Sequence, residues 1–244
     1  MDWLSRALSR AGVLPPAEAE RAILAGRVRV NGQVRTQPLS PARAEDRVTV
    51  DGHPVDLTVR TRALMFHKPK GLVCAGTDPE GVGTVFEALR NVLPPALQGY
   101  GWHAVGRLDR NTTGLLLFTN DEQLVAHATA PATHLPKRYV AKVGGALEDA
   151  RLEPLRRGIL LDDGLARPAK ASIRAERTVE LTLSEGRNHQ VKRMLGAVGL
   201  PVLELHREAV GTLVLDVPEG AWRELTEGEI ASALRFSRAR TDTR

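Results

Sequence analysis

The sequence has one cysteine, Cys74, among its 244 residues. A single thiol excludes both a disulfide framework and a cysteine-clustered zinc site. No stretch approaches the ~18 uninterrupted apolar residues that a membrane-spanning helix requires. The first ten residues (MDWLSRALSR) are amphipathic and charged, so they do not resemble a secretory signal peptide. We therefore expect a cytoplasmic protein.

Lysine and aromatic residues are also scarce. Only six of the 34 basic residues are lysine, so 28 are arginine, and aromatic residues make up 4% of the chain. The formal net charge is +5. Arginine binds phosphate through a planar fork and stacks on bases, so this bias favours contact with RNA. The codon composition of a GC-rich genome would produce the same bias.

Residues 1–55 are predicted to form a small N-terminal domain. Apolar residues recur at helical spacing over residues 3–11, and Pro15-Pro16 begins a second helix that ends at Gly26. Residues 28–34 predict two strands joined by an Asn-Gly turn, and a further strand is expected at residues 47–50. Such a short segment lies near the lower limit for independent folding, so it needs a partner surface.

These runs resemble a known RNA-binding module. The stretches "LSRALSRAG", "AEAERAILAGRVRVNGQV" and "EDRVTVDG" are similar to the S4-like domain found in a ribosomal protein and in many RNA-modifying enzymes. The resemblance implies that basic side chains lie along RNA phosphates. The matching residues are Arg6, Arg10, Arg27 and Arg29. A solvated basic surface is the alternative interpretation.

A second domain is predicted over residues 63–236, after a polar connection at 51–62 and before a basic tail at 237–244. Short apolar runs bounded by Gly, Pro or Asn predict strands, and amphipathic stretches between them predict helices. The pattern indicates an α+β fold with a mixed, mainly antiparallel sheet and flanking helices. We expect strands at residues 63–66, 71–74, 115–119, 139–143, 179–183 and 212–215, and helices at 121–128, 147–157 and 188–198.

Asp109 is the strongest candidate for chemistry. It lies between Arg107 and Arg110 in a short loop that leads directly into an apolar strand. A carboxylate beside cations stays ionised, and an apolar wall strengthens local electric fields. Such an anion is suited to nucleophilic attack or to stabilising an oxocarbenium-like sugar. A surface Asx turn is the structural alternative.

The segment "GRLDRNTTGLLLFTND" resembles the central motif of pseudouridine synthases of the RsuA/RluB/RluE/RluF type. Three further stretches match this family in order: "FHKPKGLVCAGTD", "LPKRYVAKV" and "LTLSEGRNHQVKRMLGAVGLPVLELHREAVG". Together with the S4-like module, the resemblance covers nearly the whole chain. It implies that residues 63–236 form a pseudouridine synthase catalytic domain in which Asp109 is the catalytic residue.

The resemblance also assigns roles to other side chains. It implies that the ring of Tyr139 lies against the target base and that Lys192 pairs with Asp109. Further candidates for RNA binding are Arg107, Arg110, Arg187, Arg193 and Arg207. Arg110 is also a candidate to fill the gap left by an everted base. Lys68 could be solvated or contact RNA, and His189 is expected to be a neutral histidine that packs at a helix start.

The implied reaction breaks the bond from carbon 1′ to nitrogen 1, turns the uracil and rejoins it through carbon 5. Mass and redox state do not change, so no cofactor is expected, and no metal site is predicted from the histidine spacing. Asp109 would either add to carbon 1′ or remove a proton from carbon 2′, and the sequence leaves both routes open.

We therefore expect site-specific isomerisation of uridine in ribosomal RNA by a monomeric enzyme that flips the target base. "GRNHQVKRM" followed by "ELHREAVG" resembles the small-subunit branch, which favours 16S rRNA over 23S rRNA. A non-catalytic RNA-binding ribosome-assembly protein is the alternative from another class. A ribonuclease or glycosidase would require a second acid near Asp109, for which Asp121 is the nearest candidate.

Overall fold

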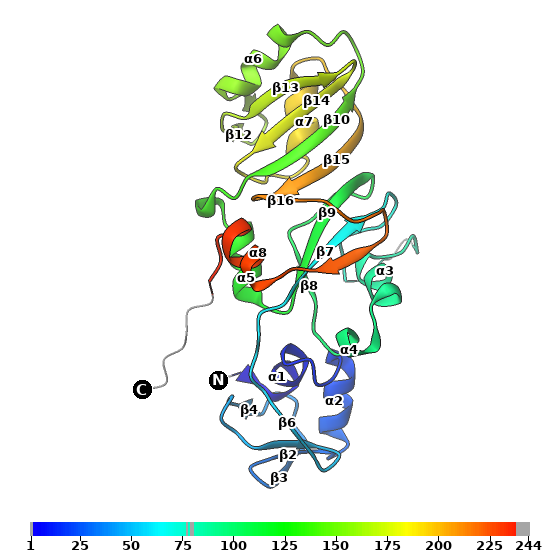
Figure 1. The fold of residues 1–244 in the computed structure, drawn as a ribbon, viewed down its shortest axis with the longest axis vertical. Helices are drawn as coiled ribbons and strands as arrows, with labels where there is room; N and C mark the ends of the chain where they lie inside the picture. Colours follow the sequence, from blue (N-terminus) through cyan, green and yellow to red (C-terminus); the bar gives the residue numbers. More distant parts are fainter. Residues whose placement is uncertain (1, 77, 79–80, 238–244) are drawn as a thin grey trace. The chain divides into compact units, whose positions relative to one another are not determined.

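The computed structural model describes residues 2–76, 78 and 81–237, which divide into two compact units (Figure 1). The first unit is built from residues 2–62, 89–103 and 119–122, and the second unit from the remaining described residues. Both units therefore combine several segments, whereas the predicted domains 1–55 and 63–236 are continuous. Of the predicted basic tail, only Ser237 lies within the described residues.

The N-terminal part of the first unit forms the helices α1 and α2 and a four-stranded antiparallel sheet in the order β3-β2-β5-β6. Pro16 occupies the first turn of α2, where a missing backbone N–H costs nothing. Asn31 and Gly32 both have positive φ, as the turn between β2 and β3 requires. The bounds are α1 Leu4–Arg10, α2 Pro16–Leu24, β2 Val28–Val30, β3 Gln33–Arg35, β5 Val48–Val50 and β6 His53–Val55, with β1 Asp2–Trp3 paired to β4 Pro41–Ala42.

The predicted helices, hairpin and third strand of this unit are confirmed, but β6 lies where only a polar connection was expected. Leu4, Leu8 and Ile23 are fully buried against the apolar face of the sheet. The segment 89–103, which includes α4 (Pro95–Gln98), also packs on this unit. The ring of Tyr100 packs so closely on Gly12 that a β-carbon at Gly12 would lie only 2.4 Å from Tyr100 Cζ. A segment distant in sequence therefore packs against the N-terminal residues.

The second unit is built on a mixed sheet in the order β13-β14-β10-β15-β9-β7-β17. Strand β10 is antiparallel to both β14 and β15, whereas β15 and β9 are parallel. The strands are β7 Ala63–Lys68, β9 Thr112–Thr119, β10 Lys137–Val143, β13 Lys170–Ala175, β14 Thr178–Leu183, β15 Val202–Val210 and β17 Trp222–Glu224, with β8 His103–Val105 beside β9 and β16 Leu213–Val214 beside β15.

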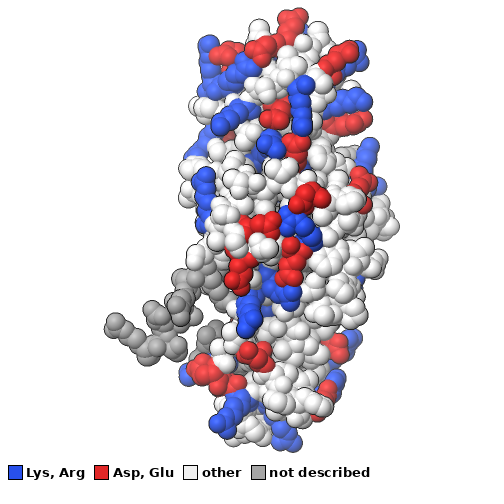
Figure 2. Space-filling model, in the orientation of Figure 1, with Lys and Arg blue, Asp and Glu red and all other residues white. Residues whose placement is uncertain are grey.

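Two apolar clusters stabilise this sheet. Buried residues of β10 and β14 pack against α6 (Asp149–Arg157) and α7 (Gln190–Ala197). Residues of β7 and β9 pack against α5 (Glu122–Thr129) and α8 (Glu227–Ala233). Acidic and basic side chains are mixed over the face of β10 and β14 that α6 and α7 leave open (Figure 2).

Several predicted boundaries in the second unit are wrong. No strand forms at residues 71–74, where Val73 makes only an isolated bridge to Thr84. The predicted helix 188–198 begins only at Gln190, because the backbone of His189 is left-handed. Strand β15, helix α3 (Val85–Val92) and helix α8 were not predicted. The α+β class with a mixed, mainly antiparallel sheet is nevertheless confirmed.

Candidate active site

Asp109 lies in the loop between β8 and β9, as the sequence predicts. Leu108 beside it is 7% exposed, so an apolar anchor precedes the carboxylate. The backbone N–H of Leu108 donates to the Cys74 sulfur at 3.4 Å, and the N–H of Thr112 donates to the Asp109 carbonyl at 3.0 Å. The loop is therefore held on both sides of Asp109.

Lys68 at the end of β7 holds this loop through hydrogen bonds to its backbone carbonyls. Its side chain is completely buried, and Nζ donates to the carbonyls of Pro69, Arg110 and Thr112 at 3.0, 3.2 and 3.0 Å. Burial lowers the pKa of Lys68, because the charged ammonium is removed from water. Neither solvation nor RNA contact, the two roles left open by the sequence, fits this position. Lys68 instead links the end of β7 to the Asp109 loop.

Both carboxylate oxygens of Asp109 have a cationic or imidazole neighbour. Lys192 Nζ on α7 lies 2.6 Å from Oδ2, and His189 Nε2 lies 3.3 Å from Oδ1. The Asp109 and Lys192 side chains are 28% and 34% exposed, so the pair is partly shielded yet open to a ligand. A charge-assisted hydrogen bond of this length fixes the direction of the carboxylate.

His189 lies at the start of α7, as predicted, but its side chain does not pack there. Its side chain is 55% exposed, and its left-handed backbone (φ 48°) turns the chain at the N-cap of α7. Gln190 behind it is buried, accepts from the Arg187 backbone N–H at 3.0 Å and donates to Glu185. His189 at the N-cap and Lys192 in the first turn of α7 both reach the Asp109 carboxylate.

A cavity of about 460 Å³ opens beside Asp109. Tyr139, half-buried on β10, lines this cavity together with Asp109 and His189. Lys137 lines it two residues earlier on the same strand, and burial, together with the neighbouring charge of Arg207, lowers its pKa. The cavity therefore combines one carboxylate, one phenol and several cationic groups.

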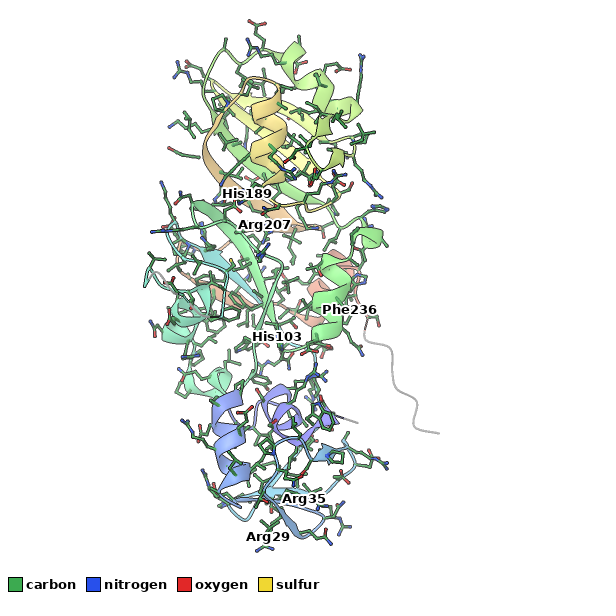
Figure 3. All side chains as sticks on the ribbon, turned by 180° about the vertical axis from the view of Figure 1, so that it is seen from behind. Arg29, Arg35, His103, His189, Arg207 and Phe236 are labelled. Atoms are coloured by element: carbon green, nitrogen blue, oxygen red, sulfur yellow. The ribbon has the colours of Figure 1, made fainter. Side chains whose placement is uncertain are left out.

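The five predicted RNA-binding arginines of this unit lie in different environments. Arg107 and Arg110 are exposed at the rim of the cavity. Arg207 is only 3% exposed and Nε donates to the Leu115 carbonyl at 2.7 Å, so it supports the cavity wall from within (Figure 3). This burial argues against the predicted phosphate contact. Arg187 and Arg193 form ion pairs with Asp163.

The four arginines predicted to bind RNA in the first unit also differ. Arg6 pairs with Glu122, and Arg10 donates to Asp2 at 2.7 Å with its side chain 15% exposed. Arg27 follows α2 and pairs with Asp51. Arg29 lies exposed on β2, where Nη1 donates to the Gly32 carbonyl at 3.2 Å (Figure 3). Phosphate contact by Arg6 or Arg10 would require their present ion pairs to open.

A hydrolase would need a second catalytic acid near Asp109, and Asp121 and Glu185 are the two acids to consider. Asp121 is fully buried in the first unit and accepts from the Thr61 hydroxyl at 2.5 Å. Glu185 lies near Asp109 but accepts from the Arg167 backbone N–H and the Gln190 amide and pairs with Arg187. Neither carboxylate is available as the second acid of a glycosidase. Within the described residues, no three His, Cys, Asp or Glu side chains cluster as a metal site, and no helix is long and apolar enough to cross a membrane.

Comparison with known families matches residues 62–197 to RNA pseudouridylate synthases and residues 2–48 to the S4 domain. The first match covers more than half of the chain, including Asp109, Tyr139 and Lys192. The chain belongs to the RNA pseudouridylate synthase family. The predicted S4-like module and the predicted resemblance to the RsuA/RluB type are confirmed with it.

Related synthases are named for both ribosomal subunits. Ribosomal large subunit pseudouridine synthase B of Haemophilus influenzae is 37% identical over 91% of this chain, which spans 64% of that protein. Ribosomal small subunit pseudouridine synthase A of Yersinia pestis is 38% identical over 92% of each chain. A crystal structure of a pseudouridylate synthase aligns over 96% of this chain and all of its own, with a TM-score of 0.66 and 32% identity.

Proposed function

We propose that this protein isomerises uridine to pseudouridine in ribosomal RNA, with Asp109 as the group that acts on the ribose. The observation that carries the proposal is the position of the Asp109 carboxylate, 2.6 Å from the Lys192 ammonium and in one cavity with Tyr139. Family membership supplies the reaction class, and the relatives named as pseudouridine synthases of the ribosomal subunits support the substrate class.

The proposed chemistry begins with an everted uridine in the cavity beside Asp109. The Asp109 carboxylate, directed by its hydrogen bond from Lys192, either adds to carbon 1′ or accepts a proton from carbon 2′ as the bond to nitrogen 1 breaks. The freed uracil turns and bonds to carbon 1′ through carbon 5, while the carboxylate leaves carbon 1′ in the first route or returns the proton to carbon 2′ in the second. Carbon 5 then loses its proton and nitrogen 1 gains one, so the product has the same atoms as the substrate.

Tyr139 is proposed to lie against the uracil during this turn. A half-buried aromatic ring in the cavity wall gives the base an apolar face to stack on, and its hydroxyl lies at the edge of the stack. Arg107 and Arg110, exposed at the rim, are proposed to contact phosphates flanking the target nucleotide. Arg110 also follows Asp109 directly, which suits it to occupy the gap in the RNA stack.

The S4 domain is proposed to bind RNA away from the cavity, with exposed Arg27 and Arg29 as its phosphate ligands. We propose 16S rRNA as the target, because the motifs at residues 186–194 and 204–211 resemble the small-subunit branch. Free rRNA or a subunit assembly intermediate would then be the substrate of a monomeric, cytoplasmic enzyme. The relatives are named for both subunits, so both rRNAs belong in the test.

The decisive experiment incubates the purified protein with 16S and 23S rRNA transcripts and maps pseudouridine at nucleotide resolution. We expect one modified position, and Asp109→Asn should abolish it while RNA affinity stays within about threefold, since the substitution keeps the shape of the side chain. Turnover by Asp109→Asn near the wild-type rate would refute the role of Asp109. Tight binding of rRNA by the wild type with no pseudouridine would favour the non-catalytic assembly protein.

A further inference from the structure

A small acidic hairpin lies beside the candidate active site. Strands β11 (Leu160–Leu161) and β12 (Gly164–Leu165) form a two-stranded sheet connected by Asp162 and Asp163. Asp163 contacts two arginines at once. Its Oδ1 lies 3.3 Å from Arg187 Nη1, and its Oδ2 lies 2.9 Å from Arg193 Nη2.

These two arginines flank the groups that touch Asp109. Arg187 lies two residues before His189, and Arg193 directly follows Lys192. The segment 187–193 therefore carries both partners of the Asp109 carboxylate, and Asp163 binds the segment near each end. No other carboxylate among the described ion pairs contacts both arginines.

The hairpin backbone reinforces the contact at Arg187. Its Nη1 donates to the Gly164 carbonyl at 3.1 Å, and its Nη2 donates to the Leu165 carbonyl at 2.6 Å. On its other side, Arg187 Nε lies 3.5 Å from Glu185, which also bonds the buried Gln190. An RNA phosphate that competes for Arg187 would have to displace these carbonyls, which are fixed in the hairpin backbone and cannot swing away as a flexible carboxylate side chain can. Arg187 is thus a link between hairpin and loop rather than a free phosphate ligand.

We infer that Asp163 is a positioning residue for the reaction: it holds the segment 187–193 so that Lys192 and His189 meet the Asp109 carboxylate. The inference rests on the proposed function, since its effect is on the rate of isomerisation. A single exposed ion pair contributes little to stability, but here one carboxylate joins two arginines that are further held by carbonyls. Displacing a catalytic group by about 1 Å can reduce a rate by about 10²-fold, so a modest loss of order is enough to be measured.

The test measures single-turnover rate and RNA affinity for Asp163→Ala, Asp163→Asn and Asp163→Glu. We expect Asp163→Ala and Asp163→Asn to reduce the rate about tenfold, with the dissociation constant for rRNA within about twofold of wild type. Asp163→Glu should restore most of the rate, because it returns the charge to both arginines. Asp162→Ala is the matched control: Asp162 lies in the same turn, is 79% exposed and pairs only with Arg193, so its rate should stay within twofold.

A wild-type rate for folded Asp163→Ala and Asp163→Asn would overturn the inference. Tighter rRNA binding by these variants at an unchanged rate would also overturn it. Asp163 would then only occupy the place on the arginines that an RNA phosphate takes when the RNA binds. A crystal structure of Asp163→Asn provides a readout that needs no activity. The inference requires a longer or disordered Lys192–Asp109 contact there, whereas an unchanged 2.6 Å contact contradicts it. Failure of the proposed function would instead appear as absence of pseudouridine with the wild type.

Discussion

Gly114 on β9 lies directly opposite Arg207 on the parallel strand β15, and the two backbones leave no room for a side chain. A β-carbon on Gly114 would lie 2.3 Å from the Arg207 carbonyl oxygen. Gly114 also has a φ of +108°, which residues with a β-carbon rarely adopt. Strands β9 and β15 therefore approach each other closely five residues after Asp109.

Gly114→Ala should therefore lower the free energy of unfolding by about 2–4 kcal/mol, because backbone overlap adds to the strain of the positive φ. Chemical denaturation with a fluorescence readout measures the change. Gly220→Ala is the control, since Gly220 has a φ of +77° but no atom within 4 Å of its missing β-carbon. It should cost only about 1–2 kcal/mol. Equal losses for both variants would show that strain alone decides the effect.

Lys192→Met should reduce the rate of pseudouridine formation by about 10²–10³-fold, because the carboxylate loses the charge-assisted bond that directs it. Single-turnover assays with the mapped rRNA would measure this. Lys192→Arg keeps the charge with different geometry and should retain more activity than Lys192→Met. If the two variants were equally active, charge on residue 192 would not matter to the reaction.

Arg29→Ala should weaken rRNA binding several-fold and reduce the slope of log affinity against log salt by about one, since one phosphate contact is lost. Titrations at several salt concentrations provide both quantities. Arg27→Ala makes a useful comparison, because Asp51 already neutralises Arg27 in the free protein. Its effect should be smaller than that of Arg29→Ala. An unchanged salt slope for Arg29→Ala would remove Arg29 from the RNA-binding surface.

Glu229 provides a pH-dependent contribution to stability. Hydrogen bonds from Arg223 and from the Thr226 backbone lower its pKa from 4.5 to about 2. Because the pKa of Glu229 is lower in the folded than in the unfolded protein, its ionised form stabilises the fold at pH values above the unfolded-state pKa. This contribution is lost as the pH falls towards 2. The melting temperature should thus fall between pH 5 and pH 2, and less steeply for Glu229→Gln. Parallel curves for the two proteins would contradict this assignment.

Local patterns in the sequence predict much of this fold. The Asn31-Gly32 turn, the start of α2 at Pro16 and the loop position of Asp109 all depend on neighbouring residues. Strand β15 was not predicted, because the charged Arg207 occupies a buried position between Leu205 and Ala209 and so breaks the alternation of apolar and polar residues that marks a strand. Whether such a run forms a strand depends on the neighbouring strands β10 and β9.

The environment of single side chains was harder to predict than the elements that carry them. The pairing of Lys192 with Asp109 came from family resemblance, and the structure places the two in contact. The contact of His189 with Asp109 depends on a left-handed backbone that only the folded loop stabilises. Likewise, Arg6 and Arg193 bind acids distant in sequence, which a count of basic residues does not reveal.

Strand β9 is buried on both sides, from Leu115 to Phe118. Amide protons in such a strand exchange with solvent only when the whole unit opens, rather than through local fluctuations. The Asp109 loop is therefore anchored to a strand whose amide protons we expect to exchange only when the second unit opens. Denaturant should abolish activity and tertiary structure in a single cooperative step, with no inactive but folded species in between.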